Sequence, residues 1–269
     1  MNIEEKIKFD HDKKQFVNEL NNRNNDIEKC IQYCDGYDFN SFKSIKESIK
    51  TKKITKLFLI GMGSSLYASQ YALAQLEHCN ILILSIEAAE FKNKYMHLVD
   101  DHTLLVIISQ SGNSKEIVDA IEELKSRNCT FELITITNNL NGYLYTNYKN
   151  SILLNASKEF YISHNSYLNT LIVIKYLLEY LFDECCYSLK TDDELLTKLN
   201  NYDEELLKHK SSILTLFENI ACVDFIYDSK SKFNAINSTL LLREGIELMT
   251  ACYSKNEYLH GEHLVEIPN

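Results

Sequence analysis

The sequence predicts an α/β fold in which a five-stranded parallel sheet carries helices on both faces and is followed by a partial second unit. Two observations lead to this prediction. Strand-like apolar segments alternate with helical segments through residues 54–154, and two turns rich in glycine and serine each join a strand to a helix. Strands separated by helices pair in parallel and are buried on both sides. A chain of 269 residues is long enough for one large domain or two small ones.

The expected elements follow in order along the chain. An N-terminal segment, residues 1–50, is polar and helical in pattern. The first domain, residues 51–185, is expected to hold strands at 56–60, 81–86, 103–108, 131–136 and 151–154, and helices at roughly 65–78, 87–97, 114–127 and 140–147. An apolar helix at 164–184 closes this domain, and its aromatic and aliphatic stripe is typical of core or dimer packing.

The pattern restarts after a charged helical linker at residues 186–220. A strand at 221–227 and a helix at 231–248 open a second unit, residues 221–269. The remaining length leaves room for only one strand and one or two helices, so this unit is expected to be incomplete and to need the first domain or a partner to cover it.

Composition narrows the function classes. The chain has 28 Lys and Arg against 38 Asp and Glu, a formal charge of −10, which argues against a nucleic-acid-binding or anionic-membrane-binding surface. No apolar stretch has the length of a membrane span, and residues 1–10 are charged, unlike a signal peptide. The eight cysteines lack metal-ligand spacing and are expected to be reduced thiols of a cytoplasmic protein. No metal or other cofactor is expected.

The segment 104–118 is the most informative part of the chain. An apolar strand, Leu104 to Ile108, leads into the turn SQSGNS at 109–114, and a helix follows. Three hydroxyls, an amide and a glycine therefore lie at a helix N-terminus, where free N–H groups and the helix dipole favour an anion. One helix cap needs only one hydroxyl, so capping alone does not explain this turn. Because it lacks the lysine of a P-loop, it suits a small sugar phosphate better than a nucleotide triphosphate.

An earlier turn has the same design. Residues 61–65, GMGSS, follow a strand and open a helix. The sixth position of a dinucleotide-binding fingerprint is Leu66 here, which disfavours a Rossmann nucleotide site. Both turns lie at the carboxyl ends of strands, where a parallel sheet places its ligands, so they are expected to form one site.

These two turns resemble those of the sugar isomerase (SIS) domain family, whose sheet is flavodoxin-like. The resemblance implies that the substrate is a sugar phosphate. It makes Ser65, Ser109, Gln110, Ser111 and Ser114 the phosphate ligands and puts Gly63 and Ser64 near the sugar. Residues 158–163 align with the segment that carries a glutamate before the sugar-lining backbone, which adds Glu159 and Ser163. Glu159 either orients this loop or touches the ligand's amine or hydroxyl, and the orienting role is favoured.

The same resemblance points to chemistry in the C-terminal segment. Glu244 lies sixteen residues before His260, the spacing of a motif in the isomerase domain of glucosamine-6-phosphate synthase, and the match includes Glu257 and Gly261. There the first glutamate moves a proton between C1 and C2, and the histidine opens the sugar ring. A carboxylate suits proton transfer at carbon, and histidine titrates near neutrality. Glu244 and His260 are therefore the candidate catalytic residues.

Some residues depart from that motif. Leu241 replaces a lysine and Glu262 a proline, and the run EYLHG at 257–261 looks closer to the fructosamine-phosphate deglycase branch. Residues 228–230 replace the glycine-rich turn expected after the strand at 221–227, so the second unit is not expected to be another phosphate site.

Two function classes stay open: an isomerase, deaminase or deglycase acting on an (amino)hexose 6-phosphate, and a non-catalytic phosphosugar sensor. The family resemblance further implies a homodimer with a shared active site, in which residues 1–50 pack on the first domain or on the partner. A solvated arm is the alternative for that segment.

Overall fold

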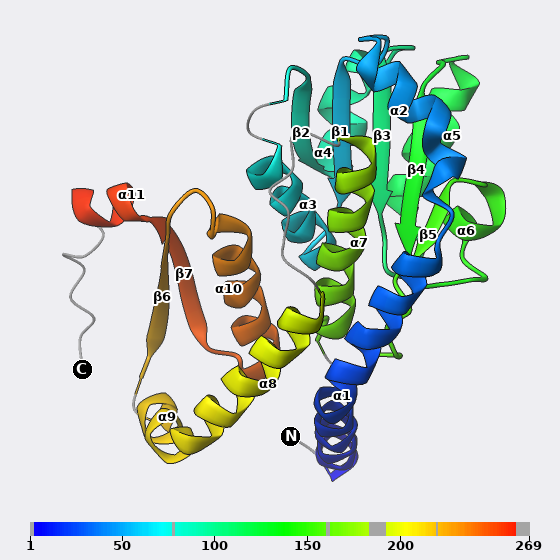
Figure 1. Cartoon of the computed structure of the whole chain (residues 1–269). Helices are drawn as coiled ribbons and strands as arrows, with labels where there is room; N and C mark the ends of the chain where they lie inside the picture. Colours follow the sequence, from blue (N-terminus) through cyan, green and yellow to red (C-terminus); the bar gives the residue numbers. More distant parts are fainter. Residues whose placement is uncertain (1–2, 77–78, 160–161, 183–191, 219, 262–269) are drawn as a thin grey trace. The chain divides into compact units, whose positions relative to one another are not determined.

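The computed structural model contains the predicted five-stranded parallel sheet (Figure 1). The structure describes residues 3–76, 79–159, 162–182, 192–218 and 220–261. The sheet has the order β2-β1-β3-β4-β5, and all four neighbouring pairs are parallel. Its strands are β1 (Lys56–Gly61), β2 (Leu82–Glu87), β3 (Thr103–Ile108), β4 (Glu132–Thr137) and β5 (Ser151–Leu153). This is the strand order of flavodoxin-like folds, which confirms the predicted fold class.

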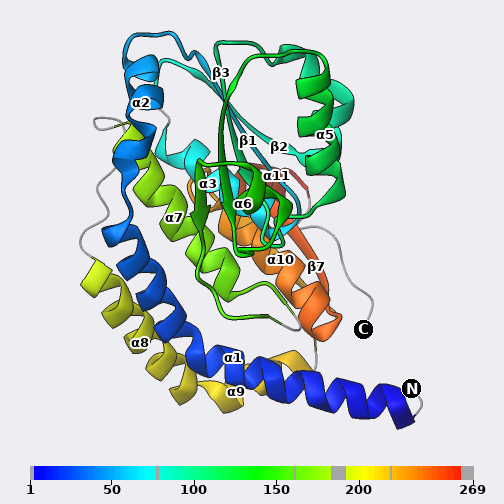
Figure 2. The same cartoon turned by 90° about the vertical axis from the view of Figure 1, so that its right-hand side faces the viewer.

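Helices cover both faces of this sheet (Figure 2). Phe58 of β1 pairs with Leu105 of β3, and both belong to a buried cluster with α5 (Lys115–Ser126). Their neighbours along the strands point to the opposite face because side chains alternate. That face is covered by α3 (Ser64–Gln75), which packs in turn on α7 (Asn165–Leu181). All six residues of β3 are buried, so the strand that leads into the 109–114 turn is anchored along its whole length.

The N-terminal segment forms a long helix, α1 (Ile3–Gly36), then η1 (Phe39–Phe42) and α2 (Lys43–Lys50). The C-terminal half of α1 packs on α7 and buries Ile27, Cys30, Ile31 and Cys34. The carboxylate of Asp26, also fully buried, accepts hydrogen bonds from Ser157 N (2.9 Å), Ser157 Oγ (2.7 Å) and Asn165 Nδ2 (3.1 Å). Of the alternatives expected for residues 1–50, packing on the first domain therefore holds for this half of α1.

Two predicted helices are shorter than expected. The helix expected at 87–97 is broken into α4 (Ala88–Glu90), a π turn η2 (Phe91–Tyr95) and η3 (Met96–Leu98). Phe91 and Met96 are both buried although they are five residues apart, and the wider π turn directs both to the core. The helix expected at 140–147 is reduced to α6 (Tyr143–Asn147). The side chain of Asn139 accepts from Asn141 N (3.0 Å), and this turn competes with helix before residue 143.

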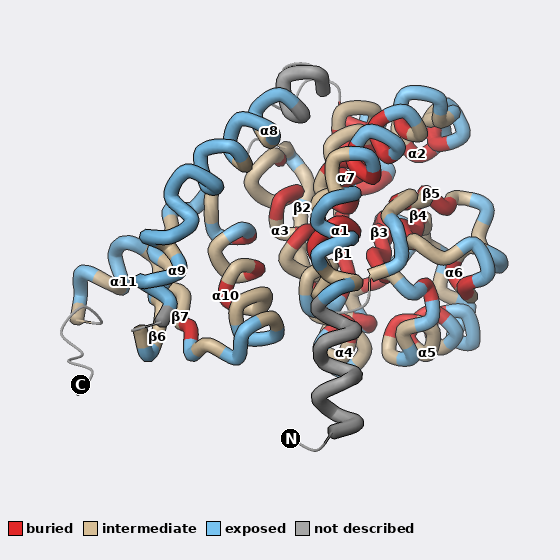
Figure 3. The backbone as a smooth tube through the Cα atoms, turned by 90° about the horizontal axis from the view of Figure 1, so that it is seen from below, coloured by how far each residue is buried: buried red, intermediate tan, exposed pale blue. Residues whose placement is uncertain are grey.

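The chain divides into two units, residues 1–188 and 189–269. The boundary expected at 185/186 lies outside the described residues, as do the last residues of the helices expected at 65–78 and 164–184. The second unit contains α8 (Asp192–Lys208), α9 (Lys210–Glu218), β6 (Cys222–Tyr227), α10 (Lys232–Ile246), β7 (Met249–Ser254) and α11 (Lys255–His260). The described parts of α8 and α9 are mostly exposed (Figure 3).

The prediction of a single strand in the second unit was wrong. β6 and β7 pair in parallel from Cys222 with Met249 to Tyr227 with Ser254, and α10 packs on both. β7 has the sequence MTACYS, in which Thr250 and Ser254 are polar and Ala251 is small, so it lacks the continuous apolar run that identifies a buried strand. No helix in the described part of the chain is long and apolar enough to cross a membrane.

Candidate functional site

The first serine turn is shaped by close contact between strand and helix. A Cβ added to Gly61, the last residue of β1, would lie 2.8 Å from the backbone nitrogen of Leu66, so the first turn of α3 sits directly on the strand end. Gly63, the N-cap of α3, has a left-handed φ of 51°. Ser64 and Ser65 are the first two residues of the helix, and α3 has no side-chain cap. Their hydroxyls therefore do not serve as its N-cap.

The second serine turn also leaves its helix without a side-chain cap. Ser114 occupies the N-cap position of α5, but its Oγ lies 2.9 Å from Ser109 Oγ instead of accepting from the helix N–H groups. The Ser111 hydroxyl accepts from Asn113 N at 3.2 Å, within the turn. Gly112 has a φ of +65°, a conformation that favours glycine. The first N–H groups of α5 are thus not satisfied by a capping side chain, which suits an anion site.

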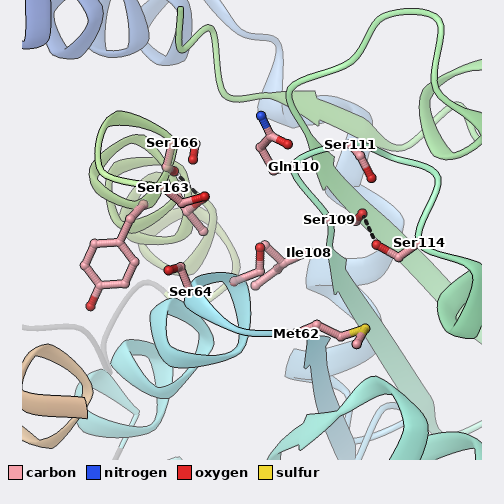
Figure 4. A pocket seen from close by; sticks show the side chains of 12 residues that line it. Met62, Ser64, Ile108, Ser109, Gln110, Ser111, Ser114, Ser163 and Ser166 are labelled. Atoms are coloured by element: carbon pink, nitrogen blue, oxygen red, sulfur yellow. Dashed lines mark hydrogen bonds between the residues drawn. The ribbon is translucent and has the colours of Figure 1, made fainter. Parts of the chain in front are cut away.

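The two turns meet in one pocket of about 190 Å³ (Figure 4). The pocket includes seven of the predicted site residues: Ser64, Ser65, Ser109, Gln110, Ser111, Ser114 and Ser163. Gly63 belongs to the first turn but is not among the residues that line the pocket. The expectation that both turns contribute to one site agrees with this geometry.

Helix α7 supplies residues that sequence analysis did not select. Ser166, Tyr167 and Thr170 line the pocket from the first turns of α7, and Met62 and Ile108 line it from the strand ends. The apolar stripe of α7 is core, but the helix also buries the hydroxyls of Ser166 and Thr170, one helical turn apart, beside the fully buried amides of Asn165 and Asn169. The polar residues NS and NT, four positions apart at the start of a strongly apolar helix, were a usable signal in the sequence.

Glu159 binds the N-terminus of α7. Its Oε1 accepts from His164 N (2.8 Å) and Ser166 N (3.0 Å), and its Oε2 accepts from Ser166 Oγ. A carboxylate at a helix N-terminus satisfies free N–H groups and interacts favourably with the helix dipole. Glu159 is not among the residues that line the pocket, whereas Ser166 is. These contacts fit the orienting role, which stays a prediction.

The pocket is polar and uncharged. The side chains that line it are hydroxyls, one amide and apolar groups, and the N-terminal turns of α3 and α5 lie beside it. Burial raises the pKa of Tyr167, so its phenol stays neutral across the physiological range. An anion here would be held by neutral donors and helix N-termini.

The candidate catalytic residues lie in the second unit. Glu244 is exposed on α10 and His260 is exposed at the end of α11. Neither is among the residues that line the pocket. Glu257 has a local function: its carboxylate accepts from Ser254 N (2.9 Å), while Ser254 Oγ accepts from Glu257 N (3.2 Å). This capping box, with the Ser254 N–H as the main cause, lowers the pKa of Glu257. Glu262 lies outside the described residues.

The turn after β6 carries an acidic group where the first unit has hydroxyls. Asp228 Oδ1 accepts from Ser231 N (2.9 Å) and Ser231 Oγ (2.7 Å) at the start of α10, and these bonds lower the pKa of Asp228. An ionised carboxylate at this helix N-terminus occupies the donors that an anion would use and repels a phosphate. The expectation that the second unit is not a phosphate site agrees with this geometry.

Comparison with known proteins gives a consistent result. A family model of the SIS domain matches residues 50–180. Isomerizing glutamine–fructose-6-phosphate aminotransferase from Methanococcus maripaludis is 24% identical over 230 residues, which are 82% of this chain and 38% of that protein. The chain thus spans well under half the length of this relative.

Two solved structures are similar in fold. The C-terminal domain of glucosamine-fructose-6-phosphate aminotransferase from Francisella tularensis has a TM-score of 0.71 at 19% identity, over 93% of this chain and 72% of that one. Tagatose-6-phosphate ketose/aldose isomerase from Escherichia coli has a TM-score of 0.68 at 18% identity, over 92% and 69%. At these identities the likeness concerns the fold. With the family match, the serine turns and the strand order, residues 50–180 of this chain form a SIS domain.

Proposed function

We propose that the pocket binds the phosphate group of a phosphorylated sugar on the 109–114 turn. One observation carries this proposal: the hydroxyls of both serine turns converge on a single uncharged pocket beside the N-termini of α3 and α5. The donors are neutral and numerous, which suits a phosphate monoester. The pocket has a volume of about 190 Å³, which suits a small sugar phosphate.

Substitution of the turn tests this proposal. We expect Ser109→Ala with Ser111→Ala to weaken binding of fructose 6-phosphate by about 2–4 kcal/mol, taking about 1–2 kcal/mol for each hydrogen bond lost to the anion. Isothermal titration calorimetry measures the loss. Ser126→Ala is the matched control, because Ser126 lies at the far end of the same helix, where its Oγ donates to Glu123 O. Unchanged affinity in the double variant would refute the assignment.

For the reaction, we propose an aldose–ketose isomerase, deaminase or deglycase that acts on an (amino)hexose 6-phosphate. The names of the similar proteins support this class. Glu244 would take a proton from the carbon next to the carbonyl or imine carbon and return it to the neighbouring carbon through an enediol or enolamine. His260 would deliver a proton to the ring oxygen as its bond to the anomeric carbon breaks, while the anomeric hydroxyl loses its proton to solvent and becomes the open-chain carbonyl. We further propose a homodimer in which His260 approaches the 109–114 turn of the partner; a stable monomer by light scattering at micromolar concentration would contradict this.

The alternative is a phosphosugar sensor without catalytic activity. It is favoured by Leu241, which stands where the synthase motif has a lysine, and by Asp228, which replaces a glycine-rich turn in the second unit.

Solvent-deuterium exchange at the carbon next to the carbonyl separates the two functions. For the enzyme, Glu244→Gln should lower exchange by about 10²–10⁴ while binding is kept, because glutamine cannot accept the proton. His260→Ala should slow exchange of cyclic substrates more than of open-chain analogues. If the wild type binds the sugar phosphate but shows no exchange, the enzyme proposal is refuted and the sensor proposal is supported.

A further inference from the structure

The 109–114 turn is held in place by a second loop that does not line the pocket. This loop, residues 137–144, connects β4 to α6. Asn138 N donates to Gln110 O (3.0 Å), Asn139 Nδ2 to Ser111 O (2.9 Å) and Leu144 N to Gly112 O (3.0 Å). Three consecutive carbonyl groups of the turn are thus bound by one neighbouring loop.

These bonds determine which polar groups face an anion. Carbonyl oxygens repel a phosphate, and here all three point toward the 137–144 loop. In a trans peptide the carbonyl and the following N–H point in opposite directions, so the N–H of Ser111 points away from this loop. The loop therefore helps the turn to present donors.

The two segments are packed backbone against backbone. A Cβ on Gly142 would lie 2.9 Å from Ser111 O and 3.2 Å from Gly112 Cα, and one on Gly112 would lie 2.7 Å from Thr137 Oγ1. At Gly112 and Gly142 the turn and the loop approach too closely for a side chain to fit between them. A change in the loop is therefore transmitted to the turn rather than absorbed by a gap.

Two side chains of this loop donate to the turn carbonyls: Asn139 Nδ2 to Ser111 O at 2.9 Å, and Thr137 Oγ1 to Gln110 O at 3.4 Å. The Asn139 bond is the shorter of the two, and Ser111 lines the pocket. While the side-chain Nδ2 of Asn139 donates to Ser111 O, its side-chain Oδ1 accepts from Asn141 N at 3.0 Å. We infer that Asn139 is a positioning residue for phosphate binding, which acts through Ser111 without touching the ligand. This inference rests on the proposed phosphosugar function. It adds to the site a residue that lies outside the pocket lining.

The test compares three variants of the full chain by calorimetry with fructose 6-phosphate and with inorganic phosphate. Asn139→Ala should lower the affinity for both ligands by the same factor, about threefold to tenfold. This is the effect expected when one neutral hydrogen bond that orients a phosphate-binding residue is lost. Asn139→Ser should lower the affinity as much as Asn139→Ala does, because a serine can still accept from Asn141 N but is too short to reach Ser111 O. Asn141→Ala is the control and should bind like the wild type, because Asn141 is exposed and contributes its backbone N–H to the loop.

A second measurement separates positioning from general loosening. The phosphate-induced shift of the Ser111 amide proton should shrink in both Asn139 variants, while the melting temperature of Asn139→Ser stays within a few degrees of the wild type. Wild-type affinity in both Asn139 variants would overturn this inference and leave the proposed function standing. Equal weakening in Asn141→Ala would also overturn it. Absence of phosphosugar binding in the wild type would instead refute the proposed function and this inference with it.

Discussion

Gly112→Ala is the substitution for which the structure gives the clearest expected cost. Gly112 has a φ of +65°, and an added Cβ would lie 2.7 Å from Thr137 Oγ1 and 3.4 Å from Gly142 Cα. The left-handed backbone costs an alanine about 1 kcal/mol, and overlap with Thr137 adds about 1–3 kcal/mol. We therefore expect a loss of about 2–4 kcal/mol in unfolding free energy, together with weaker phosphosugar binding because the turn must move.

Urea unfolding and calorimetry of the same variant measure the two effects. Gly36→Ala is the matched control: no atom lies within 4 Å of its added Cβ, so its stability should change by less than about 1 kcal/mol. Adding Thr137→Ala to Gly112→Ala removes the overlapping oxygen, and the pair should show a favourable coupling of about 1–2 kcal/mol. A Gly112→Ala variant as stable and as tight-binding as the wild type would refute this account of the turn.

Two further predictions concern the fold. Asp26→Ala should cost about 3 kcal/mol in urea unfolding, because three hydrogen bonds to a buried carboxylate are lost; a loss below about 1 kcal/mol would contradict this. The Lys56 ammonium, 2.7 Å from Asp100, holds the pKa of that carboxyl below its usual value. This pair therefore contributes stability at neutral pH that disappears as the pH falls through the lowered folded-state pKa. Urea unfolding from pH 7 to 2 should show Asp100→Asn converging with the wild type at low pH, and a constant difference would exclude the linkage.

The sheet was predictable because its strands are near-continuous apolar runs. Residues 103–108 match β3 at both ends, and the other predicted strands of this sheet differ from the observed ones by one residue at one end or at both. A strand buried on both faces is apolar at most positions, and this pattern is hard to mistake. The serine turns were predictable for a related reason, since several hydroxyls beside a glycine exceed what one helix cap requires.

The elements that were missed depend on contacts distant in sequence. β7 is recognisable from its pairing with β6, because its sequence MTACYS mixes polar and small residues with apolar ones. The broken helix at 87–97 follows from a core that receives both Phe91 and Met96. Local propensity favours a regular helix there, and tertiary packing overrides it.

Residue roles were harder to predict than residue positions. Glu159 was placed near the site, and the structure adds that its carboxylate binds the start of α7. Glu257 matched a catalytic motif by spacing, yet its carboxylate takes part in a capping box with Ser254. Sequence spacing indicates which residues can lie close together. The role of a carboxylate depends on its hydrogen-bond partners, which the spacing does not reveal.

The central claim is that the 109–114 turn and the start of α5 hold the phosphate of a sugar phosphate. The most direct test is a titration of the isotope-labelled full chain with fructose 6-phosphate, followed by backbone amide NMR, with fructose as the unphosphorylated control. The account predicts that the largest shifts occur at Ser111, Lys115 and Glu116, and that fructose at the same concentration leaves these amides unchanged. Saturable shifts confined to other parts of the chain, or equal shifts with fructose, would contradict it.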